Sequence, residues 1–232
     1  MKKKCIIIPA FNEAENISSV IAAIKRGIDS DIIVIDDGST DRTAEKAEQS
    51  GAVVIRHPFN MGYGVALQTG YKYAVKKKYD LLLQMDGDGQ HDPVAAEAFF
   101  QQLESGECDV LVGSRFLGRD GYDVGFLKRT GIGLFRIVIR MLSGERITDP
   151  TSGFQCLNRN VFTIFTEDHF PCDYPDANII IMLLRKGFVI REIPVAMVEN
   201  PEGRSMHRGI FTKLYYFFKI FLSIFIVLIR EK

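Results

Sequence analysis

The sequence lacks an excess of charge of either sign. Its 232 residues include 29 lysines and arginines and 29 aspartates and glutamates, so the formal net charge is zero. A protein that binds nucleic acid over a broad surface usually carries a basic excess, although local patches still matter in a neutral chain. We therefore predict no nucleic-acid partner and expect ligands to be bound at local sites.

Cysteine is scarce and scattered. The chain has no CxxC pair, and its four cysteines are Cys5, Cys108, Cys156 and Cys172. This spacing argues against a structural zinc site and against a disulfide framework. A signal-peptide core is also missing, because the apolar run after the basic start covers only residues 5–8. We therefore expect a protein that stays in the reducing cytosol.

Apolar residues make up 47% of the chain, which is enough for a sizeable core. As far as residue 115, short β-branched runs such as DIIVID alternate with helical patterns such as EAENISSVIAAIKRG. This alternation predicts βαβ units and an α/β fold with a mostly parallel sheet. Beyond this point the pattern becomes mixed, and a long helix is predicted over 126–142. No repeat or low-complexity linker divides the chain, so we predict one compact unit.

Polar residues follow the ends of four predicted strands. They are Asn12, Glu13, Asp36, Asp37, Asn60, Gly62, Asp86 and Asp88. In an open parallel sheet these strand ends share one edge, where ligands bind. The first turn, PAFNEAEN, lacks the GxGxxG motif, which disfavours a nicotinamide or flavin enzyme.

The segment MDGDGQ carries the strongest chemical signal. Asp86 and Asp88 are two residues apart, so in an extended segment both carboxylates leave the same face and repel each other unless a cation lies between them. Oxygen ligands of this kind suit Mg²⁺ or Mn²⁺, which often share their coordination with substrate phosphates. The alternative is a solvated glycine-rich turn whose acids cap a helix starting at Pro93. The other polar strand ends favour the metal.

Six segments together resemble the polyprenyl-phosphate branch of the family 2 glycosyltransferases, which is the dolichol-phosphate mannosyltransferase-like branch. In chain order they are IIIPAFNE, VIDDGSTD, NMGYGVALQTG, QMDGDGQHDP, VGSRF and DPTSGFQCLNR. The resemblance covers nearly the whole chain. It implies a GT-A fold, which is a Rossmann-like sheet with helices on both faces. It also implies an inverting enzyme with a nucleotide-sugar donor, Mg²⁺ or Mn²⁺ and a polyprenyl-phosphate acceptor.

The resemblance divides the compact unit by role. Residues 1–115 would bind the nucleotide sugar and 116–207 would bind the acceptor, while the residue pattern of 208–232 predicts a helix that contacts a membrane or a partner. The residues implied to line the nucleoside are Pro9, Phe11 and Glu13, with Asp36 or Asp37 on the base or ribose. A carboxylate accepts a hydrogen bond from uracil or from guanine, so the donor stays open between a UDP-sugar and a GDP-sugar.

The resemblance also places the metal and phosphate ligands. Asp86, Asp88 and Gln90 match the metal and diphosphate positions. Arg115, with Lys128 and Arg129, would face the donor diphosphate and the acceptor phosphate, because a guanidinium binds phosphate oxygens in pairs. The alternative for Arg115 is a surface ion pair. The matching residues of the DxxSGF segment are Asp149, Ser152 and Gly153, whose alternative role is a capped turn. We predict catalytic roles for Asp88, Arg115, Arg129 and Asp149.

The expected chemistry needs no general base. A lipid phosphate is already ionised at neutral pH, and a metal with arginines would neutralise the departing diphosphate. His91 is therefore interpreted as a helix cap or as support for the metal ligands.

The chain departs from the branch pattern near its end and in a predicted helix. Asn200 and Met206 occupy positions where the branch has arginine and lysine, and Asn178 stands where a glutamate is expected, with Asp176 close by. Nearby cations that could substitute are Arg204, His207 and Arg208. The preference for donor or acceptor could therefore differ.

The C-terminal segment allows three interpretations. Residues 211–229 are long enough to span a bilayer, but Lys213 and Lys219 interrupt them. A polar stripe at helical spacing favours a helix lying in the membrane interface, and its members are Arg208, Thr212, Lys219, Ser223 and Arg230. A helix packed on the body or on a partner subunit is the third interpretation, and a small membrane-protein partner is a further expectation.

Three functions are compatible with these features. The leading one is metal-dependent transfer of a sugar to a polyprenyl phosphate by a protein attached to the cytoplasmic face of a membrane. The second is transfer to a hydroxyl of a polysaccharide, and the third is a catalytically weak scaffold that binds nucleotide sugars.

Overall fold

The computed structural model describes residues 2–87, 89, 94–118, 126–168, 170–171, 173–196 and 210–230. Within these residues seven strands form one sheet: β1 (Lys4–Ala10), β2 (Asp31–Asp36), β3 (Val53–Arg56), β4 (Leu81–Gln84), β5 (Val110–Ser114), β6 (Gln155–Asn158) and β7 (Ile190–Pro194). The helices are α1 (Ile17–Lys25), α2 (Thr43–Gln49), α3 (Tyr63–Lys76), α4 (Val94–Glu104), α5 (Phe126–Ser143), α6 (Arg159–Ile164), α7 (Ala177–Arg185) and α8 (Ile210–Arg230).

The sheet has the strand order β3-β2-β1-β4-β6-β5-β7. All neighbouring pairs are parallel except those of β6, which runs antiparallel between β4 and β5. The predicted mostly parallel α/β sheet is therefore confirmed. Because β1, β2, β3 and β4 run in the same direction, they end together at one side of the sheet, which we call the carboxyl edge.

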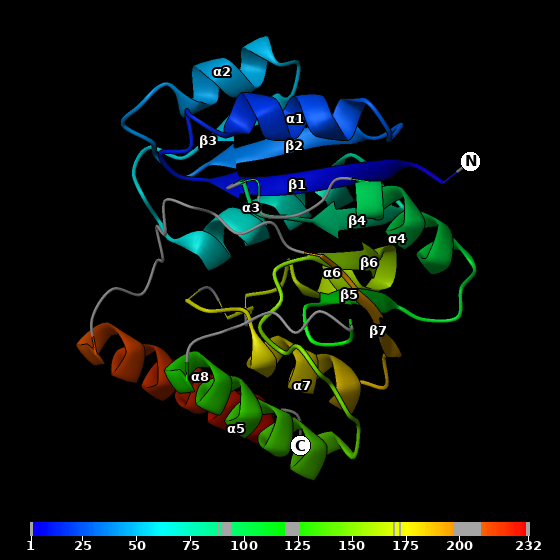
Figure 1. The fold of residues 1–232 in the computed structure, drawn as a ribbon, viewed down its shortest axis with the longest axis vertical. Helices are drawn as coiled ribbons and strands as arrows, with labels where there is room; N and C mark the ends of the chain where they lie inside the picture. The colour runs from blue at the N-terminus through cyan, green and yellow to red at the C-terminus, as the bar shows by residue number, and fades with distance from the viewer. Residues whose placement is uncertain are drawn as a thin grey trace.

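Helices cover both faces of the sheet, as predicted (Figure 1). The central strand β1 is buried on both sides, so its apolar residues need not alternate with polar ones. Ile6 and Ile8 point to one face and pack with residues of α1 and α4, whereas Ile7 points to the other and packs with residues of α3, α6 and α7. The two cores hold the strand ends in fixed positions.

Helices α5 and α8 lie together at the end of the molecule remote from α1 and α2 (Figure 1). Phe135 of α5 and Phe221 of α8 have ring centroids 6.0 Å apart. The inner face of α8 is buried at Ile220, Ile224 and Val227 and belongs to the same core as α7. Among the described helices, none combines the length and apolarity needed to cross a membrane.

Three of the four cysteines, Cys5, Cys108 and Cys156, are buried free thiols, in agreement with the predicted absence of a disulfide framework. Burial raises the pKa of each of these thiols, which keeps them protonated at neutral pH. Cys172 lies outside the described residues. These three side chains therefore act as small core residues.

Candidate functional site

The loops after β1 and β2 are tied to each other at the carboxyl edge. Asn12 adopts a left-handed backbone conformation with φ of 57°, which asparagine tolerates better than most residues. Its backbone N–H donates to Ser39 Oγ at 2.9 Å, and its Oδ1 accepts from Thr40 N at 2.9 Å. The next residue, Glu13, donates its backbone N–H to Thr43 Oγ1 at 2.8 Å. The two loops therefore form one rigid rim.

Asp37 joins this rim to the loop after β3. Its buried carboxylate accepts from His57 Nδ1 at 2.7 Å and from the backbone N–H groups of Met61 at 2.9 Å and Gly62 at 2.8 Å. His57 Nε2 in turn lies 2.9 Å from Thr69 Oγ1 of α3. The predicted nucleoside residue thus organises the protein itself, and its contact with a nucleoside stays a prediction. No motif in the sequence points to His57.

Asp36 is also held within the protein. Its Oδ1 accepts from Ser39 N at 3.2 Å, and its Oδ2 lies 3.1 Å from Arg56 Nε. Gly38 in the loop after β2 lies close to the backbone of the loop after β3. A Cβ on Gly38 would lie 2.4 Å from the carbonyl carbon of Phe59. With φ of +70°, Gly38 also has a conformation that side chains disfavour.

The residues predicted to line the nucleoside differ in exposure. Pro9 is buried within β1, whereas the ring of Phe11 is 43% exposed at the carboxyl edge. Glu13 accepts from Asn16 Nδ2 at 3.0 Å. Of these residues, Phe11 therefore offers the largest accessible apolar surface at this edge.

Asp86, just beyond β4, is fixed by a hydrogen-bonded chain that starts in the core. Tyr71 donates its hydroxyl to Gln84 Oε1, Gln84 Nε2 donates to Tyr63 Oη at 3.3 Å, and Tyr63 donates to Asp86 Oδ1 at 3.0 Å. Burial, followed by the charge of Asp86, raises the pKa of Tyr63, so its hydroxyl stays protonated. The hydroxyl of Tyr63, which sequence reasoning missed, thereby orients a predicted metal ligand.

Gly153 lies directly against this carboxylate. A Cβ at Gly153 would lie 3.0 Å from Asp86 Oδ2 and 3.2 Å from Tyr63 Oη. The DxxSGF segment therefore lies beside Asp86, which is predicted to be a metal ligand. The other two predicted metal ligands, Asp88 and Gln90, lie outside the described residues, as does His91. Among the residues that are described, no three His, Cys, Asp or Glu side chains gather closely enough to form a metal site.

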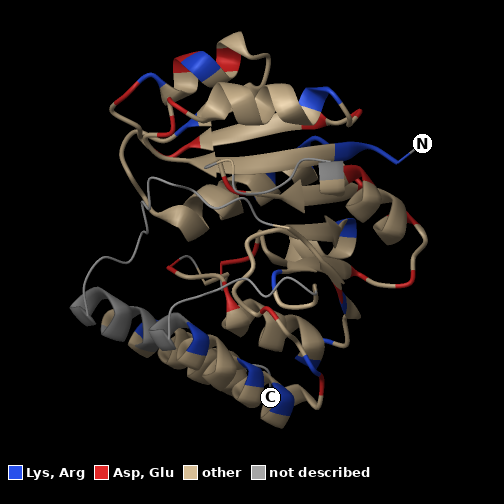
Figure 2. Ribbon diagram, viewed as in Figure 1, with Lys and Arg blue, Asp and Glu red and all other residues tan. Residues whose placement is uncertain are grey.

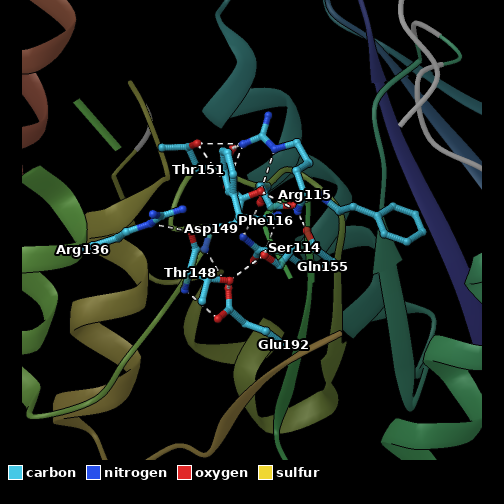
Figure 3. Close-up of polar contacts among 12 residues, drawn as sticks. Ser114, Arg115, Phe116, Arg136, Thr148, Asp149, Thr151, Gln155 and Glu192 are labelled. Carbon is cyan, nitrogen blue, oxygen red and sulfur yellow. Dashed lines mark hydrogen bonds and ion pairs between the residues drawn. The ribbon is translucent and has the colours of Figure 1, made fainter. Parts of the chain in front are cut away.

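Arg115 and Asp149 form a buried bidentate ion pair (Figure 3). Arg115 Nε lies 2.6 Å from Asp149 Oδ2, and Arg115 Nη2 lies 2.7 Å from Asp149 Oδ1. Arg115 Nη2 also donates to Thr151 Oγ1 at 2.9 Å. The relative exposure is 9% for Arg115 and 0% for Asp149. The alternative of a surface ion pair is therefore wrong, because the pair is buried beside the loop that carries Gly153.

The remaining predicted residues lie elsewhere. Arg129 is exposed in the first turn of α5, and the described contacts do not bring it to Asp86 or Arg115. The side chain of Lys128 is outside the described residues, as are Asn200, Arg204, Met206, His207 and Arg208. Asn178 is fully buried, and its Nδ2 donates to Ser223 Oγ of α8 at 2.7 Å. This residue therefore joins α7 to α8.

Glu192 of β7 is a further residue that sequence reasoning missed. Its carboxylate accepts from the backbone of the Thr148–Asp149 turn, which precedes the DxxSGF loop (Figure 3). The segment IREIP shows charged residues in a strand, but the sequence does not tell which of them faces the interior.

Helices α5 and α8 expose several large apolar side chains, which we call the α5–α8 surface. Its members are Leu134, Ile137, Met141, Phe218, Phe221, Leu222, Phe225, Ile226 and Ile229. A groove of about 290 Å³ between the two helices is lined by Met141, Phe221 and Phe225, among others. Figure 2 shows basic positions and no acidic ones on α5. The surface therefore combines apolar side chains with positive charge.

The predicted polar stripe of α8 is partly turned toward the protein. Lys219 Nζ lies 2.7 Å from Asp173 Oδ2, and Ser223 accepts from Asn178. A cavity of about 570 Å³ lies between α7 and α8 beside these contacts, and none of the residues predicted for catalysis or ligand binding lines it. The packed interpretation of α8 is thus correct for its inner face, while its outer face belongs to the α5–α8 surface.

Residues 5–165 match the family model described as glycosyl transferase family 2. The chain belongs to this family and is a glycosyltransferase, as the motifs predicted. It is 27% identical to the UDP-N-acetylglucosamine–dolichyl-phosphate N-acetylglucosaminyltransferase of Methanococcus voltae, over 93% of this chain and 92% of that protein. It is 25% identical to the undecaprenyl-phosphate mannosyltransferase of Micrococcus luteus, over 88% and 86% of the two chains. These relatives support the resemblance to the polyprenyl-phosphate branch.

The fold is shared with glucosyl-3-phosphoglycerate synthase from Mycobacterium tuberculosis. Its complex with Mn²⁺ and UDP-glucose superimposes with a TM-score of 0.72 and 21% identity, covering 97% of this chain and 79% of that one. The similarity supports the GT-A arrangement.

Proposed function

We propose that this glycosyltransferase transfers a sugar from a UDP- or GDP-sugar to a polyprenyl phosphate, assisted by Mg²⁺ or Mn²⁺. The observation that carries the proposal is the loop 149–153, which borders the Asp86 carboxylate through Gly153 and the Arg115 guanidinium through Asp149. A metal ligand and a guanidinium held by one loop suit a nucleotide diphosphate. The relatives named for dolichyl phosphate and undecaprenyl phosphate support the acceptor class.

In this proposal Asp86, Asp88 and Gln90 hold the divalent ion. The oxygen atoms of these side chains suit Mg²⁺ or Mn²⁺, and the ion, when bound, neutralises negative charge on the donor diphosphate. Tyr63 keeps the Asp86 carboxylate oriented through its 3.0 Å hydrogen bond. Arg115 supplies positive charge beside the leaving diphosphate, and Arg129 binds the acceptor phosphate. The ionised acceptor needs no general base.

The nucleoside is proposed to bind at the rim formed by the loops after β1, β2 and β3. Glu13 belongs to this rim and Pro9 lies buried in the strand that leads to it, Phe11 offers an exposed ring for stacking, and Asp36 or Asp37 accepts from the base or the ribose. The hydrogen bonds of the Asp37 carboxylate keep the rim rigid, which lowers the entropic cost of binding.

The acceptor is proposed to reach the enzyme from the cytoplasmic face of a membrane. Residues 1–115 would bind the donor, 116–207 the acceptor, and 208–232 the membrane surface, with a small membrane protein as a further partner. The exposed apolar and basic character of the α5–α8 surface supports this attachment, because such helices bind in the interface of anionic bilayers.

The test is a transfer assay with vesicles that contain undecaprenyl phosphate. Purified full-length protein is incubated with a panel of labelled UDP- and GDP-sugars, and the organic extract is analysed for a sugar-labelled lipid. We expect label in the lipid with Mg²⁺ or Mn²⁺ and none after EDTA. Label that appears only in water-soluble polysaccharide when glycan acceptors are added would instead support the hydroxyl-acceptor function.

A further inference from the structure

Glu192 lies in β7 and supports the turn before Asp149. Its Oε2 accepts from Thr148 N at 2.6 Å, and its Oε1 accepts from Asp149 N at 2.8 Å and from Thr148 Oγ1 at 3.1 Å. Figure 3 shows the carboxylate below this turn, on the side opposite the guanidinium of Arg115. A carboxylate that accepts from two consecutive backbone amides fixes both peptide planes.

The fixed turn then determines where Arg115 lies. Asp149 accepts three hydrogen bonds from Arg115, from Nε at 2.6 Å, Nη2 at 2.7 Å and the backbone N–H at 3.1 Å. A bidentate pair of this kind holds the plane of the guanidinium as well as its position. The orientation of Arg115 is therefore set by the Asp149 carboxylate, and the Asp149 backbone is set by Glu192.

Three charged groups contact or belong to the turn that Glu192 supports. Arg136 of α5 donates Nε to Thr148 O at 2.7 Å, Asp149 lies in the supported turn, and Arg115 lies beyond Asp149. Burial raises the pKa of Glu192, the bonds from Thr148 and Asp149 oppose this shift, and the charge of Asp149 adds to it.

Because its pKa is raised in the folded protein, ionisation of Glu192 lowers the free energy of unfolding. Between its unfolded pKa and its higher folded pKa, the native state binds more protons than the unfolded state, so the free energy of unfolding falls as pH rises. The three hydrogen bonds that Glu192 accepts from Thr148 and Asp149 hold the turn in spite of this cost in stability.

We propose that Glu192 is a positioning residue for the transfer reaction, holding the Thr148–Asp149 turn so that Arg115 faces the donor diphosphate. The role rests on the function proposed for Arg115. Glu192 itself contacts no substrate in this proposal and acts only through the turn.

The first experiment measures Arg115 directly and needs no activity. In a ¹⁵N-labelled full-length protein, the Nε–H signal of Arg115, assigned by its loss in Arg115→Lys, should exchange slowly with water because the hydrogen is bound to Asp149. Glu192→Gln keeps the size of the side chain but cannot accept from both amides, so this signal should exchange at least tenfold faster.

Asp109, at the amino ends of β5 and β7, provides a matched control. Asp109 accepts from Val189 N at 2.9 Å and from Asn158 Nδ2 at 2.7 Å, so it supports backbone at the amino end of β5 and β7. Asp109→Asn should lower the free energy of unfolding while leaving the Arg115 signal unchanged. An unchanged Arg115 signal in Glu192→Gln, or an equal change in both variants, would overturn the proposal.

The second experiment uses turnover. We expect kcat/KM for the donor to fall by about tenfold to a hundredfold in Glu192→Gln, because a small misorientation at a reacting centre has effects of this size. Wild-type kcat/KM for the donor in Glu192→Gln would contradict the proposal.

The two experiments separate the inference from the proposed function. An Arg115 signal that changes in a protein without lipid-phosphate transfer would sustain the positioning role and refute the function. If Glu192→Gln does not fold, Glu192→Asp replaces it, because the shorter carboxylate cannot reach the amides of both Thr148 and Asp149, and the Arg115 signal should again exchange faster. An Arg115 signal as slow as in the wild type would refute the positioning role.

Discussion

At the scale of single residues, the candidate site depends on close contacts that leave little room. Gly153 allows the DxxSGF loop to approach the Asp86 carboxylate, and a Cβ there would lie 3.0 Å from Oδ2. The carboxylate must then move by a few tenths of an ångström. Because Tyr63 and the proposed metal both depend on its position, the effect on chemistry should exceed the effect on stability.

We therefore expect Gly153→Ala to weaken Mn²⁺ binding in the presence of UDP and to lower turnover by about tenfold or more. The free energy of unfolding should change by less than about 1 kcal/mol. Calorimetry and urea unfolding measure the two effects. Gly27→Ala is a suitable control, because a Cβ at Gly27 meets no atom within 4 Å. Normal Mn²⁺ affinity in Gly153→Ala would show that Asp86 does not bind the ion.

Asp37 provides a second prediction at this scale. Asp37→Asn leaves one acceptor oxygen for three donors, so we expect the free energy of unfolding to fall by about 2–4 kcal/mol. Binding of the nucleotide should weaken along with the rim. Asp29→Asn, at an exposed position, removes the same charge and controls for it. Unchanged stability with lost nucleotide binding would instead mean that Asp37 contacts the nucleoside directly.

Several of these residues could be selected from the sequence and others could not. Asp86, Asp149 and Gly153 belong to motifs, and the structure places Asp86 beside the loop 149–153 that carries the other two. Tyr63, His57 and Glu192 act through hydrogen bonds between segments distant in the sequence, and no local pattern encodes such pairs. Asn178 was noted as unusual, but its bond to Ser223 depends on how α7 and α8 pack.

At the scale of elements, α8 has a buried inner face and an exposed outer face with different roles. Its inner residues Ile220, Ile224 and Val227 are buried, so removing the helix would expose part of the core. Substitutions on the outer face are therefore a better test of membrane attachment than truncation. Phe225 and Ile229 are suitable because their relative exposures are 58% and 56%.

We expect Phe225→Ser combined with Ile229→Ser to keep the fold and to lower binding to anionic vesicles by about tenfold or more, since two large apolar side chains no longer enter the bilayer. Sedimentation with vesicles gives the binding, and circular dichroism gives the fold. Val53→Ser removes an apolar side chain that is 44% exposed in β3, at the edge of the sheet opposite β7, and it should bind vesicles normally. Equal binding of all three proteins would make α8 a packing or subunit element.

Most elements follow from the alternation of apolar runs, but two arrangements do not. The sequence predicted the polar stripe of α8, whereas the structure turns Lys219 and Ser223 toward α7. Periodicity fixes which residues share a face and leaves open what that face contacts. The reversed direction of β6 likewise has no local signal, because the side-chain pattern of a strand is the same in either direction.

At the scale of the whole molecule, charge is unevenly distributed. Helices α5 and α8 contain seven lysines and arginines and no acidic residue, so the rest of this neutral chain carries a net charge of minus seven. Figure 2 shows acidic positions mainly on the other elements. An anionic bilayer would therefore attract one end of the molecule and repel the remainder, which would orient the protein before apolar contact.

This asymmetry predicts a marked dependence on salt. Raising the ionic strength from 0.05 M to about 0.5 M should weaken binding to anionic vesicles severalfold or more, because the screening length falls below the size of the basic surface. Binding to neutral vesicles, measured in parallel by sedimentation, should change little. If binding to anionic vesicles does not change with salt, attachment depends on apolar contact alone.

The antiparallel strand β6 also constrains the order in which the chain assembles. Its residues Gln155–Asn158 separate β4 from β5, so the N-terminal half cannot complete its own sheet while it emerges from the ribosome. Until β6 arrives, the apolar edge of β4 has no partner, and an unpaired edge of this kind is prone to associate with other chains. A fragment ending near residue 150 would keep that edge open permanently. During synthesis the protein therefore exposes the unpaired edge of β4, to which chaperones can bind.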